Sequence, residues 1–274
     1  MAEETTRIIV CGDSFNIGIG CNNLDTEPYA SLLAAQLNYP LINLAKGSSS
    51  NLSIWLQVKY AVENLHATAD DIILVAETTS ERFNWFPEGA DVHGRDITNL
   101  DVNYHEYPPY GPDSYNTYPL DRHPMQDHPA YQGRMITENV RGVIDYLDNF
   151  VDKGYDQRGY YYNRLVDEPV SKLRLIKDFY ASVYNEQLSQ MQSRSLMTMA
   201  HSLLRNLGIR HIMLLPNPHS YNNLVLAENT LGLNWGELTL HYPDTVGSGH
   251  ASPQAHQVAA AAISNKLKEN GWIQ

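Results

Sequence analysis

A serine follows the first buried strand that the sequence predicts. The apolar run Ile8–Cys11 leads directly into Gly12-Asp13-Ser14-Phe15. Open α/β sheets keep their sites at the carboxyl ends of their strands, so a hydroxyl at this junction is a candidate nucleophile if a base can reach it. Gly, Asp and Ser also favour turns, and the alternative is therefore a turn that merely ends the strand.

A histidine that could take the proton from Ser14 stands near the other end of the chain. His250 lies in a loop rich in Gly and Ser, just before an alanine-rich helix that we expect to begin at Ser252 or Pro253. A nucleophilic serine needs such a base, and often a carboxylate that orients the base. His256 falls inside the expected helix, where we expect it to be packed or to cap. The sequence thus predicts that Ser14 and His250 come within proton-sharing reach.

The order of these segments resembles the SGNH (GDSL-type) hydrolases, which are serine esterases on a flavodoxin-like sheet. The first block of that family, a strand followed by Gly-Asp-Ser, matches Val10–Phe15. The second block resembles Asn43–Asn51, and the last resembles His250–His256, with its His-x-x-Pro-x-x-His spacing. The resemblance implies that Ser14 attacks an acyl carbon while His250 accepts its proton and later returns it to the leaving alcohol.

The same resemblance implies an oxyanion hole. Its donors would be the backbone N–H of Ser14 and a backbone N–H in the Gly47-Ser48 turn, where a glycine lets the backbone approach a ligand. The third block of the family carries an asparagine that is absent here, and Thr79 occupies its place after the expected strand 72–76. A threonine hydroxyl can donate one hydrogen bond, so we expect Thr79 to replace that donor.

The acid of the triad also departs from the family. Its aspartate usually stands two or three residues before the histidine, and those places hold Gly247 and Ser248. Asp244, six residues upstream, is the candidate acid, with a backbone carbonyl as the alternative.

Three further residues are candidates for substrate binding. Asp13 and Asn51 belong to the first and second blocks of the family pattern. Arg82 follows the third strand at the same sheet edge as Ser14, and its planar guanidinium suits carboxylates and sugar oxygens. The alternative for Arg82 is an ion pair with a nearby glutamate: Glu77, Glu81 or Glu88.

The pattern along the chain predicts an α/β fold with a parallel sheet of four to five strands flanked by helices, flavodoxin-like by resemblance. At 274 residues the chain fits one large domain, residues 1–274. Apolar runs and helical spacing place the elements as follows: strands at 7–11, 41–44, 72–76 and 210–215, a fifth strand at 238–241, and helices at 28–37, 52–65, 170–207 (with a break) and after Ser252.

A long insertion separates the third strand from the next helix. Residues 84–168 are rich in Tyr and Pro, and eleven of the eighteen tyrosines lie between Tyr104 and Tyr162. Tyrosine combines an apolar face with a hydroxyl, so the insertion suits a substrate lid, a carbohydrate platform or a subunit interface; the alternative is a loop packed on itself. A helix is expected at 137–150. One loop cluster fits no metal motif, and no metal site is predicted from it: Asp121, His123, Asp127 and His128.

Composition limits the possible partners and compartments. The net charge of −12 argues against binding to nucleic acid or to an anionic membrane, because both attract basic surfaces. Cys11 and Cys21 give no disulfide framework. The acidic N-terminus lacks an apolar signal region, and no apolar run is long enough to span a membrane. We therefore expect a soluble protein, cytoplasmic or virion-associated, that needs no cofactor; oligomer formation stays open.

These observations predict a serine hydrolase that cleaves a carboxylic ester. The tyrosine-rich insertion extends this expectation to an O-acetyl group on a carbohydrate. The missing asparagine and nearby aspartate motivate an alternative, namely a non-catalytic binding or structural module of a larger assembly such as a phage particle. Nucleotide binding is disfavoured, because Gly18-Ile19-Gly20 lacks the full Gly-x-Gly-x-x-Gly pattern and no P-loop lysine follows.

Overall fold

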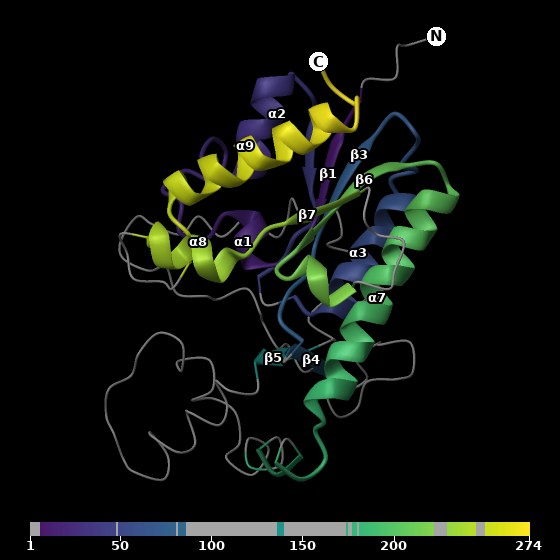
Figure 1. Ribbon diagram of the computed structural model, residues 1–274, viewed down its shortest axis with the longest axis vertical. Coiled ribbons are helices and arrows are strands. Elements are labelled where there is room, and N and C mark those ends of the chain that lie inside the picture. The colour runs from purple at the N-terminus through teal and green to yellow at the C-terminus, as the bar shows by residue number, and fades with distance from the viewer. Residues whose placement is uncertain are drawn as a thin grey trace, which may run out of the picture.

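Five parallel strands form the central sheet of the protein. The computed structural model describes residues 6–47, 49–80, 82–85, 136–139, 174, 177–179, 181–221, 229–244 and 250–274. The sheet order is β2-β1-β3-β6-β7 (Figure 1), with these bounds: β1 Ile8–Cys11, β2 Leu41–Asn43, β3 Ile72–Ala76, β6 Arg210–Leu215 and β7 Thr230–Gly232. Counted along the chain this is the 2-1-3-4-5 order of flavodoxin-like folds, which confirms the predicted fold class.

Helices cover both faces of this sheet (Figure 1). One face carries α2 (Tyr29–Leu37) and α9 (Pro253–Glu269), with α8 (Trp235–His241) beside α9. The other face carries α3 (Asn51–Glu63) and α7 (Glu186–Asn206). The helices predicted at 28–37, at 52–65 and after Ser252 and the first four strands are confirmed, with ends that shift by about one or two residues. Of the helix predicted at 170–207, α7 confirms residues 186–206.

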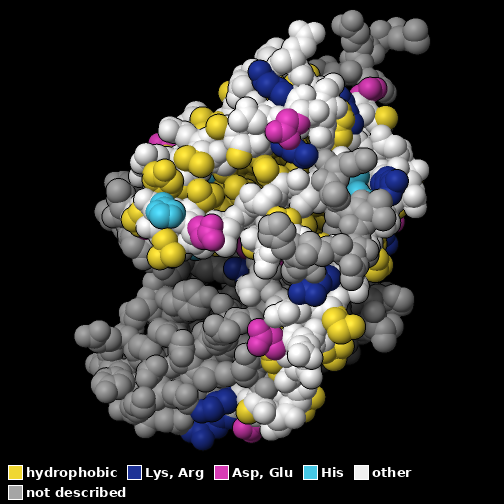
Figure 2. All heavy atoms as spheres, viewed as in Figure 1, with side chains coloured by type: hydrophobic (Ala, Val, Ile, Leu, Met, Phe, Trp, Pro, Cys, Tyr) yellow, Lys and Arg dark blue, Asp and Glu magenta, His cyan; other side chains and the backbone are white. Residues whose placement is uncertain are grey.

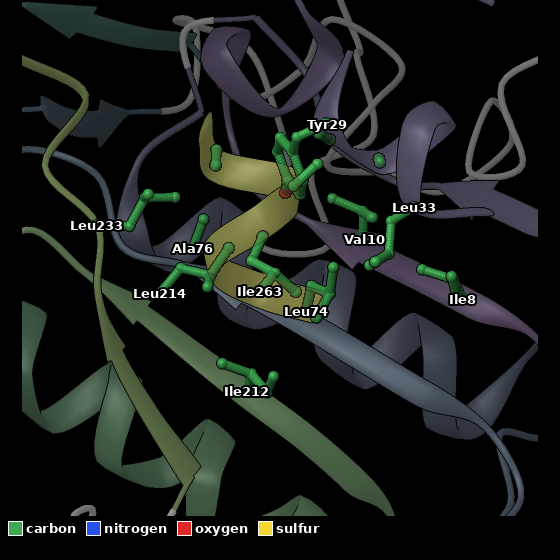
Figure 3. Close-up of a cluster of buried hydrophobic side chains, with 14 of the residues drawn as sticks. Ile8, Val10, Tyr29, Leu33, Leu74, Ala76, Ile212, Leu214, Leu233 and Ile263 are labelled. Carbon is green, nitrogen blue, oxygen red and sulfur yellow. The ribbon is translucent and has the colours of Figure 1, made fainter. Parts of the chain in front are cut away.

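The two central strands are buried on both faces, as their continuous apolar runs predict. Every residue of β1 and β3 is buried. In Figure 3 the side chains of Val10 and Leu74 point toward the same cluster as Tyr29 of α2 and Ile263 of α9. The alternate residues of both strands face α3 and α7. Because the strands are fixed from both sides, the turns at their carboxyl ends start from rigid positions.

A short helix follows β1 immediately. Helix α1 (Ser14–Ile17) begins with Asp13 as its N-cap, whose side chain accepts a hydrogen bond from the backbone N–H of Phe15. It ends at Gly18, which has a φ of 100°. The candidate nucleophile is therefore the first residue of a capped helical turn, where a bare turn was expected.

The predicted fifth strand at 238–241 is wrong. Those residues belong to α8, and the fifth strand of the sheet is β7, which pairs with β6 through the register Met213–Thr230 to Leu215–Gly232. Asn234 starts α8, because its side chain accepts a hydrogen bond from the backbone N–H of Glu237.

The predicted helix at 137–150 is contradicted at its start. Ile136–Asn139 form strand β5, which pairs antiparallel with β4 (Arg82–Trp85). This pairing joins segments that are far apart along the chain, so local periodicity gave no sign of it. Apart from β5 and the first two residues, Asn84 and Trp85, the insertion 84–168 lies outside the described residues, including Asp121, His123, Asp127 and His128.

The surface shown in Figure 2 carries hydrophobic side chains gathered over α8 and α9, where Leu240 and Val258 are exposed. In the part of the chain that the structure describes, no helix has both the length and the apolar character required to cross a membrane.

Candidate active site

The carboxyl end of β1 meets the loop before α9. The Oγ atom of Ser14 lies 3.0 Å from Nε2 of His250, although 236 residues separate the two in sequence. Ser14 is 5% exposed and His250 is half-buried. A serine hydroxyl at this distance from an imidazole nitrogen is the arrangement that acyl transfer requires of a nucleophile and its base.

Asp244 meets His250 through the backbone. The carboxylate of Asp244 accepts a hydrogen bond from the backbone N–H of His250 at 3.4 Å, and the N–H of Asp244 donates to the carbonyl of His250 at 3.3 Å. An antiparallel bridge between Pro243 and Ala251 continues this pairing. These contacts fix the backbone of His250 and do not involve its imidazole. The role of Asp244 as the acid behind the ring remains a prediction.

Asp13 ties the loop after β1 to the loop after β3. Its Oδ1 accepts hydrogen bonds from the backbone N–H of Phe15 at 3.1 Å and from Nδ2 of Asn16 at 3.0 Å. Its Oδ2 accepts from the Thr78 hydroxyl at 2.7 Å and from Nη1 of Arg82 at 2.9 Å. With both oxygens engaged and only 4% of the residue exposed, Asp13 has a role inside the protein. The sequence had suggested a role in substrate binding.

Arg82 is paired, but with a partner that the sequence did not suggest. Its Nη1 lies 2.9 Å from Asp13 Oδ2 and also donates to the carbonyl of Ser49 at 2.9 Å. The side chain is only 14% exposed. These contacts differ from the glutamate pairing that was the alternative, and the role of Arg82 in substrate binding stays a prediction. Its charge is matched inside the protein, and it holds the turn after β2.

Asn51 locks the start of α3 to the loop after β3. Its Nδ2 donates to the carbonyl of Thr78, and its Oδ1 accepts from the backbone N–H of Thr78, both at 2.9 Å. Asn51 is 3% exposed, so its amide is engaged inside the protein, where the sequence had suggested substrate binding. Thr79, the next residue, is exposed. Its expected role as a hydroxyl donor to an oxyanion remains a prediction.

The turn after β2 presents the second predicted backbone donor. Gly47 lies in a turn that is closed by a hydrogen bond from the N–H of Ser49 to the carbonyl of Lys46 at 3.2 Å. The N–H of Lys46 in turn donates to the carbonyl of Gly12 at 3.2 Å, which binds this turn to the end of β1. Ser48 lies outside the described residues.

Of the backbone N–H groups that the resemblance implies for the oxyanion hole, those of Ser14 and Gly47 belong to residues that the structure describes. Among the residues that the structure describes, the N–H groups of Ser14 and Gly47 donate to no acceptor. A Cβ at Gly47 would lie 4.0 Å from Ile19 Cδ1, which is an ordinary contact distance. Crowding by Ile19 is therefore not the reason why a glycine occupies this position.

Gln57 is a site residue that sequence reasoning missed. Its amide brackets Gly12: Oε1 accepts from the Gly12 N–H at 2.6 Å, and Nε2 donates to the Gly12 carbonyl at 3.1 Å. Nε2 also lies 3.2 Å from the hydroxyl of Ser49. The only sequence signal is a polar residue on the buried face of α3, between Ile54 and Val58.

Asn16 is the second missed residue. Its Oδ1 accepts from the Tyr29 hydroxyl at 2.8 Å, and its backbone carbonyl accepts from Nδ2 of Asn43 at 3.0 Å. Its side chain also explains Gly12, since a Cβ there would lie 2.4 Å from the amide of Asn16. The polar side chains around Ser14 thus join the ends of β1, β2 and β3 in one hydrogen-bonded network.

His256 lies behind this site in the core, as expected for a residue inside the last helix. It is fully buried, and its Nδ1 accepts from the backbone N–H of Tyr29, the first residue of α2, at 3.3 Å. Burial, and to a smaller extent the neighbouring His250, lowers the pKa of His256 to about 4. His256 is therefore a neutral, structural imidazole at pH 7.

No group of three or more His, Cys, Asp or Glu side chains within the described ranges could hold a metal ion. Searches against protein-family models, curated proteins and solved structures each return no match. What the site can do must therefore be argued from its own residues.

Proposed function

We propose that the protein is a serine hydrolase that cleaves carboxylic esters, with Ser14 as nucleophile and His250 as general base. The observation that carries this proposal is the 3.0 Å separation between Ser14 Oγ and His250 Nε2. The resemblance of the first and last blocks to the SGNH hydrolases supports it. The site also lies at the carboxyl ends of β1 and β3, between which the strand order changes direction. Doubly wound folds bind ligands at such a point.

The reaction follows from the two side chains. As Ser14 Oγ attacks the ester carbon, its proton moves to Nε2 of His250, and the carbonyl oxygen becomes an oxyanion. The N–H groups of Ser14 and Gly47 then donate to that oxyanion. His250 returns the proton to the alkoxide, the alcohol leaves, and an acyl-serine remains. Water, deprotonated by His250, attacks the acyl-serine and releases the carboxylic acid while Ser14 regains its proton.

The buried network around Ser14 supports this chemistry by holding its parts in place. Asp13 caps the turn that carries Ser14, and Gln57 grips Gly12 just before it. Because donors that are fixed before the reaction need not reorganise during it, such support favours transition-state stabilisation.

A fluorophosphonate probe tests the proposal directly. We expect the probe to add one covalent label at Ser14, and both Ser14→Ala and His250→Ala to abolish or strongly slow labelling. Ser195→Ala, an exposed serine on α7, is the matched control and should label as the wild type does. A protein that stays unlabelled while folded would instead be the non-catalytic binding or structural module, and the hydrolase proposal would be wrong.

The substrate class is a separate part of the proposal. We propose an O-acetylated carbohydrate, because the tyrosine-rich insertion offers aromatic faces and hydroxyls that suit sugars. Release of acetate from an acetylated polysaccharide, compared with hydrolysis of aryl acetates and thioesters, is the measurement. Cleavage of the simple esters without release of acetate from the polysaccharide would reject this substrate class and leave the hydrolase proposal standing.

A further inference from the structure

The ring of Phe15 lies against the imidazole of His250. The two ring centroids are 4.8 Å apart, and the planes are tilted by 43°. Phe15 directly follows Ser14 in α1, so the same helical turn carries the hydroxyl and touches the imidazole. This contact joins the two residues of the proposed reaction through a third side chain.

Phe15 is itself fixed from behind. Its ring stacks on Trp235, with centroids 5.5 Å apart and an interplanar angle of 14°. Trp235 is 8% exposed and belongs to the core cluster on the α2 and α9 face, where it also contacts Tyr29 and His256. The imidazole of His250 therefore rests on an aromatic stack that is anchored in the core.

Gly20 supports the backbone of the same histidine. It has a φ of 102°, a conformation that side chains rarely adopt. A Cβ at this position would lie 2.4 Å from the carbonyl oxygen of Ala251 and 3.2 Å from Cβ of His250. The loop after α1 thus passes against the histidine segment at a distance that only glycine permits.

We infer that Phe15 is a positioning residue for His250, assisted by Gly20, and that this role rests on the proposed function. A serine triad usually orients its histidine through a carboxylate on the ring. In this protein the ring of Phe15 also contacts the imidazole, while hydrogen bonds with Asp244 hold the backbone of the same histidine. The aromatic face also favours the imidazolium that forms when Ser14 gives up its proton, because a cation within about 6 Å of a ring centroid is attracted to it.

Replacement of Phe15 by residues with and without a ring tests this inference. We expect Phe15→Leu to lower the rate constant for fluorophosphonate labelling by about 10- to 100-fold, since a misplaced catalytic group commonly costs that much. Phe15→Tyr keeps the ring and should retain labelling within about threefold. Gly20→Ala should lower the rate by about tenfold or more. Gly208→Ala is the control, because Gly208 has a φ of 69° but open space around it.

A double-mutant cycle separates positioning from a general effect on the fold. If Phe15 acts through His250, Phe15→Leu should have no further effect on the residual labelling of His250→Ala, measured at high probe concentration. Equal losses in both backgrounds, or unchanged labelling of Phe15→Leu itself, would overturn the inference. Melting temperatures identify any variant that has simply unfolded.

Proton NMR gives a second readout of the contact. The ring protons of His250 should lose the shift caused by the Phe15 ring in Phe15→Leu, whereas those of His241 on α8 should not move. Unmoved His250 resonances would also overturn the inference. If the wild-type protein is never labelled at Ser14, the proposed function itself fails, and this result is distinct from a labelled protein that ignores the loss of Phe15.

Discussion

The two ends of the parallel sheet each bury an aspartate, but the hydrogen-bond partners of the two carboxylates differ. At the amino end, Arg7 before β1 and Asp71 before β3 form one two-pronged pair, with Nε–Oδ1 and Nη2–Oδ2 distances of 2.8 and 2.7 Å. Asp71 accepts four hydrogen bonds in all, three of them from Arg7 and one from the backbone N–H of Thr68. At the carboxyl end, Asp13 also accepts four, but from four different residues. The amino-end pair fastens two neighbouring strands, whereas the carboxyl-end network fastens three loops.

This difference indicates which end of the sheet holds its side chains in a fixed geometry. A buried polar group is costly unless it is hydrogen-bonded, and a network whose members are all satisfied restricts its own geometry. Arg7 is 29% exposed and can exchange hydrogen bonds with water, while Arg82 is 14% exposed and depends on Asp13 and Ser49. We therefore expect substitutions at the carboxyl end to lower both the stability of the protein and the reactivity of Ser14. Substitutions at the amino end should lower the stability alone.

Asp13→Asn should give the largest effect. The amide keeps one acceptor oxygen but places an NH2 group against donors, and it leaves Arg82 without its counter-charge. Removing one partner of a buried pair costs about 3–5 kcal/mol of the free energy of unfolding. Labelling of Ser14 in the remaining folded protein should fall by about tenfold or more.

Urea unfolding and labelling rates measure both effects of Asp13→Asn. The exposed Asp25 is the matched control, and Asp25→Asn should stay within about 0.5 kcal/mol of the wild type. A loss of stability without any loss of reactivity at Asp13→Asn would break the comparison between the two ends.

Acid should weaken both ends through one buried histidine each. His211 near the start of β6 donates from Nδ1 to the carbonyl of Ile209, so in its neutral form Nε2 accepts from Nδ1 of His201 at 2.9 Å. Burial lowers the pKa values of His211 and His256 to about 4 each.

The sign of the pH effect follows from these lowered values. The unfolded chain binds protons near pH 6.5 and the folded protein only near pH 4. Stability is therefore complete above pH 6.5 and falls as the pH drops toward 4, by up to about 3 kcal/mol for each histidine. Unfolding in urea at several pH values should show this slope, and His211→Gln should flatten it. A slope of the same size in His211→Gln would contradict the assignment.

The sequence was sufficient for the elements with long, local signals. The apolar runs of β1, β3 and β6 predicted these strands, and Ser252 and Pro253 predicted the start of α9. Strand β7 was missed because it has three residues and ends in Gly232, so that its pairing with β6 decides its conformation. Residues 238–241 were misread because the Asn234 cap determines α8.

The polar network could not be predicted from the same signals. Asp13 and Arg82 are 69 residues apart, and Gly12 and Gln57 are 45 residues apart. The packing of the loops at the sheet edge decides which polar side chains face one another. The spacing of these residues along the chain does not predict that packing. Ser14 and His250 were paired across 236 residues only because their segments follow a known family order.

Asp71→Asn should affect stability alone. Burial raises the pKa of Asp71, but the hydrogen bonds and charge of Arg7 outweigh this effect, so the pKa of the carboxyl is lowered overall. The amide loses the charge and one acceptor, at a cost of about 1–3 kcal/mol in the free energy of unfolding. Labelling of Ser14 in the folded fraction should match the wild type. A slower labelling rate would show that the amino end also positions the site.

Gly208→Ala should give the smallest effect and offers the sharpest contrast with Gly20. Both glycines have a positive φ, 69° for Gly208 at the amino end and 102° for Gly20 beside His250. An alanine at either position adds backbone strain of about 1 kcal/mol. At Gly208 the added Cβ meets nothing within 4 Å, whereas at Gly20 it meets the carbonyl of Ala251. Thermal unfolding should therefore show a larger loss of stability for Gly20→Ala than for Gly208→Ala, and only Gly20→Ala should slow the labelling of Ser14. If both variants were labelled at the wild-type rate, the backbone contact at Gly20 would have no part in holding His250, and the precision of the carboxyl end would have to come from the Asp13 network and Phe15 alone.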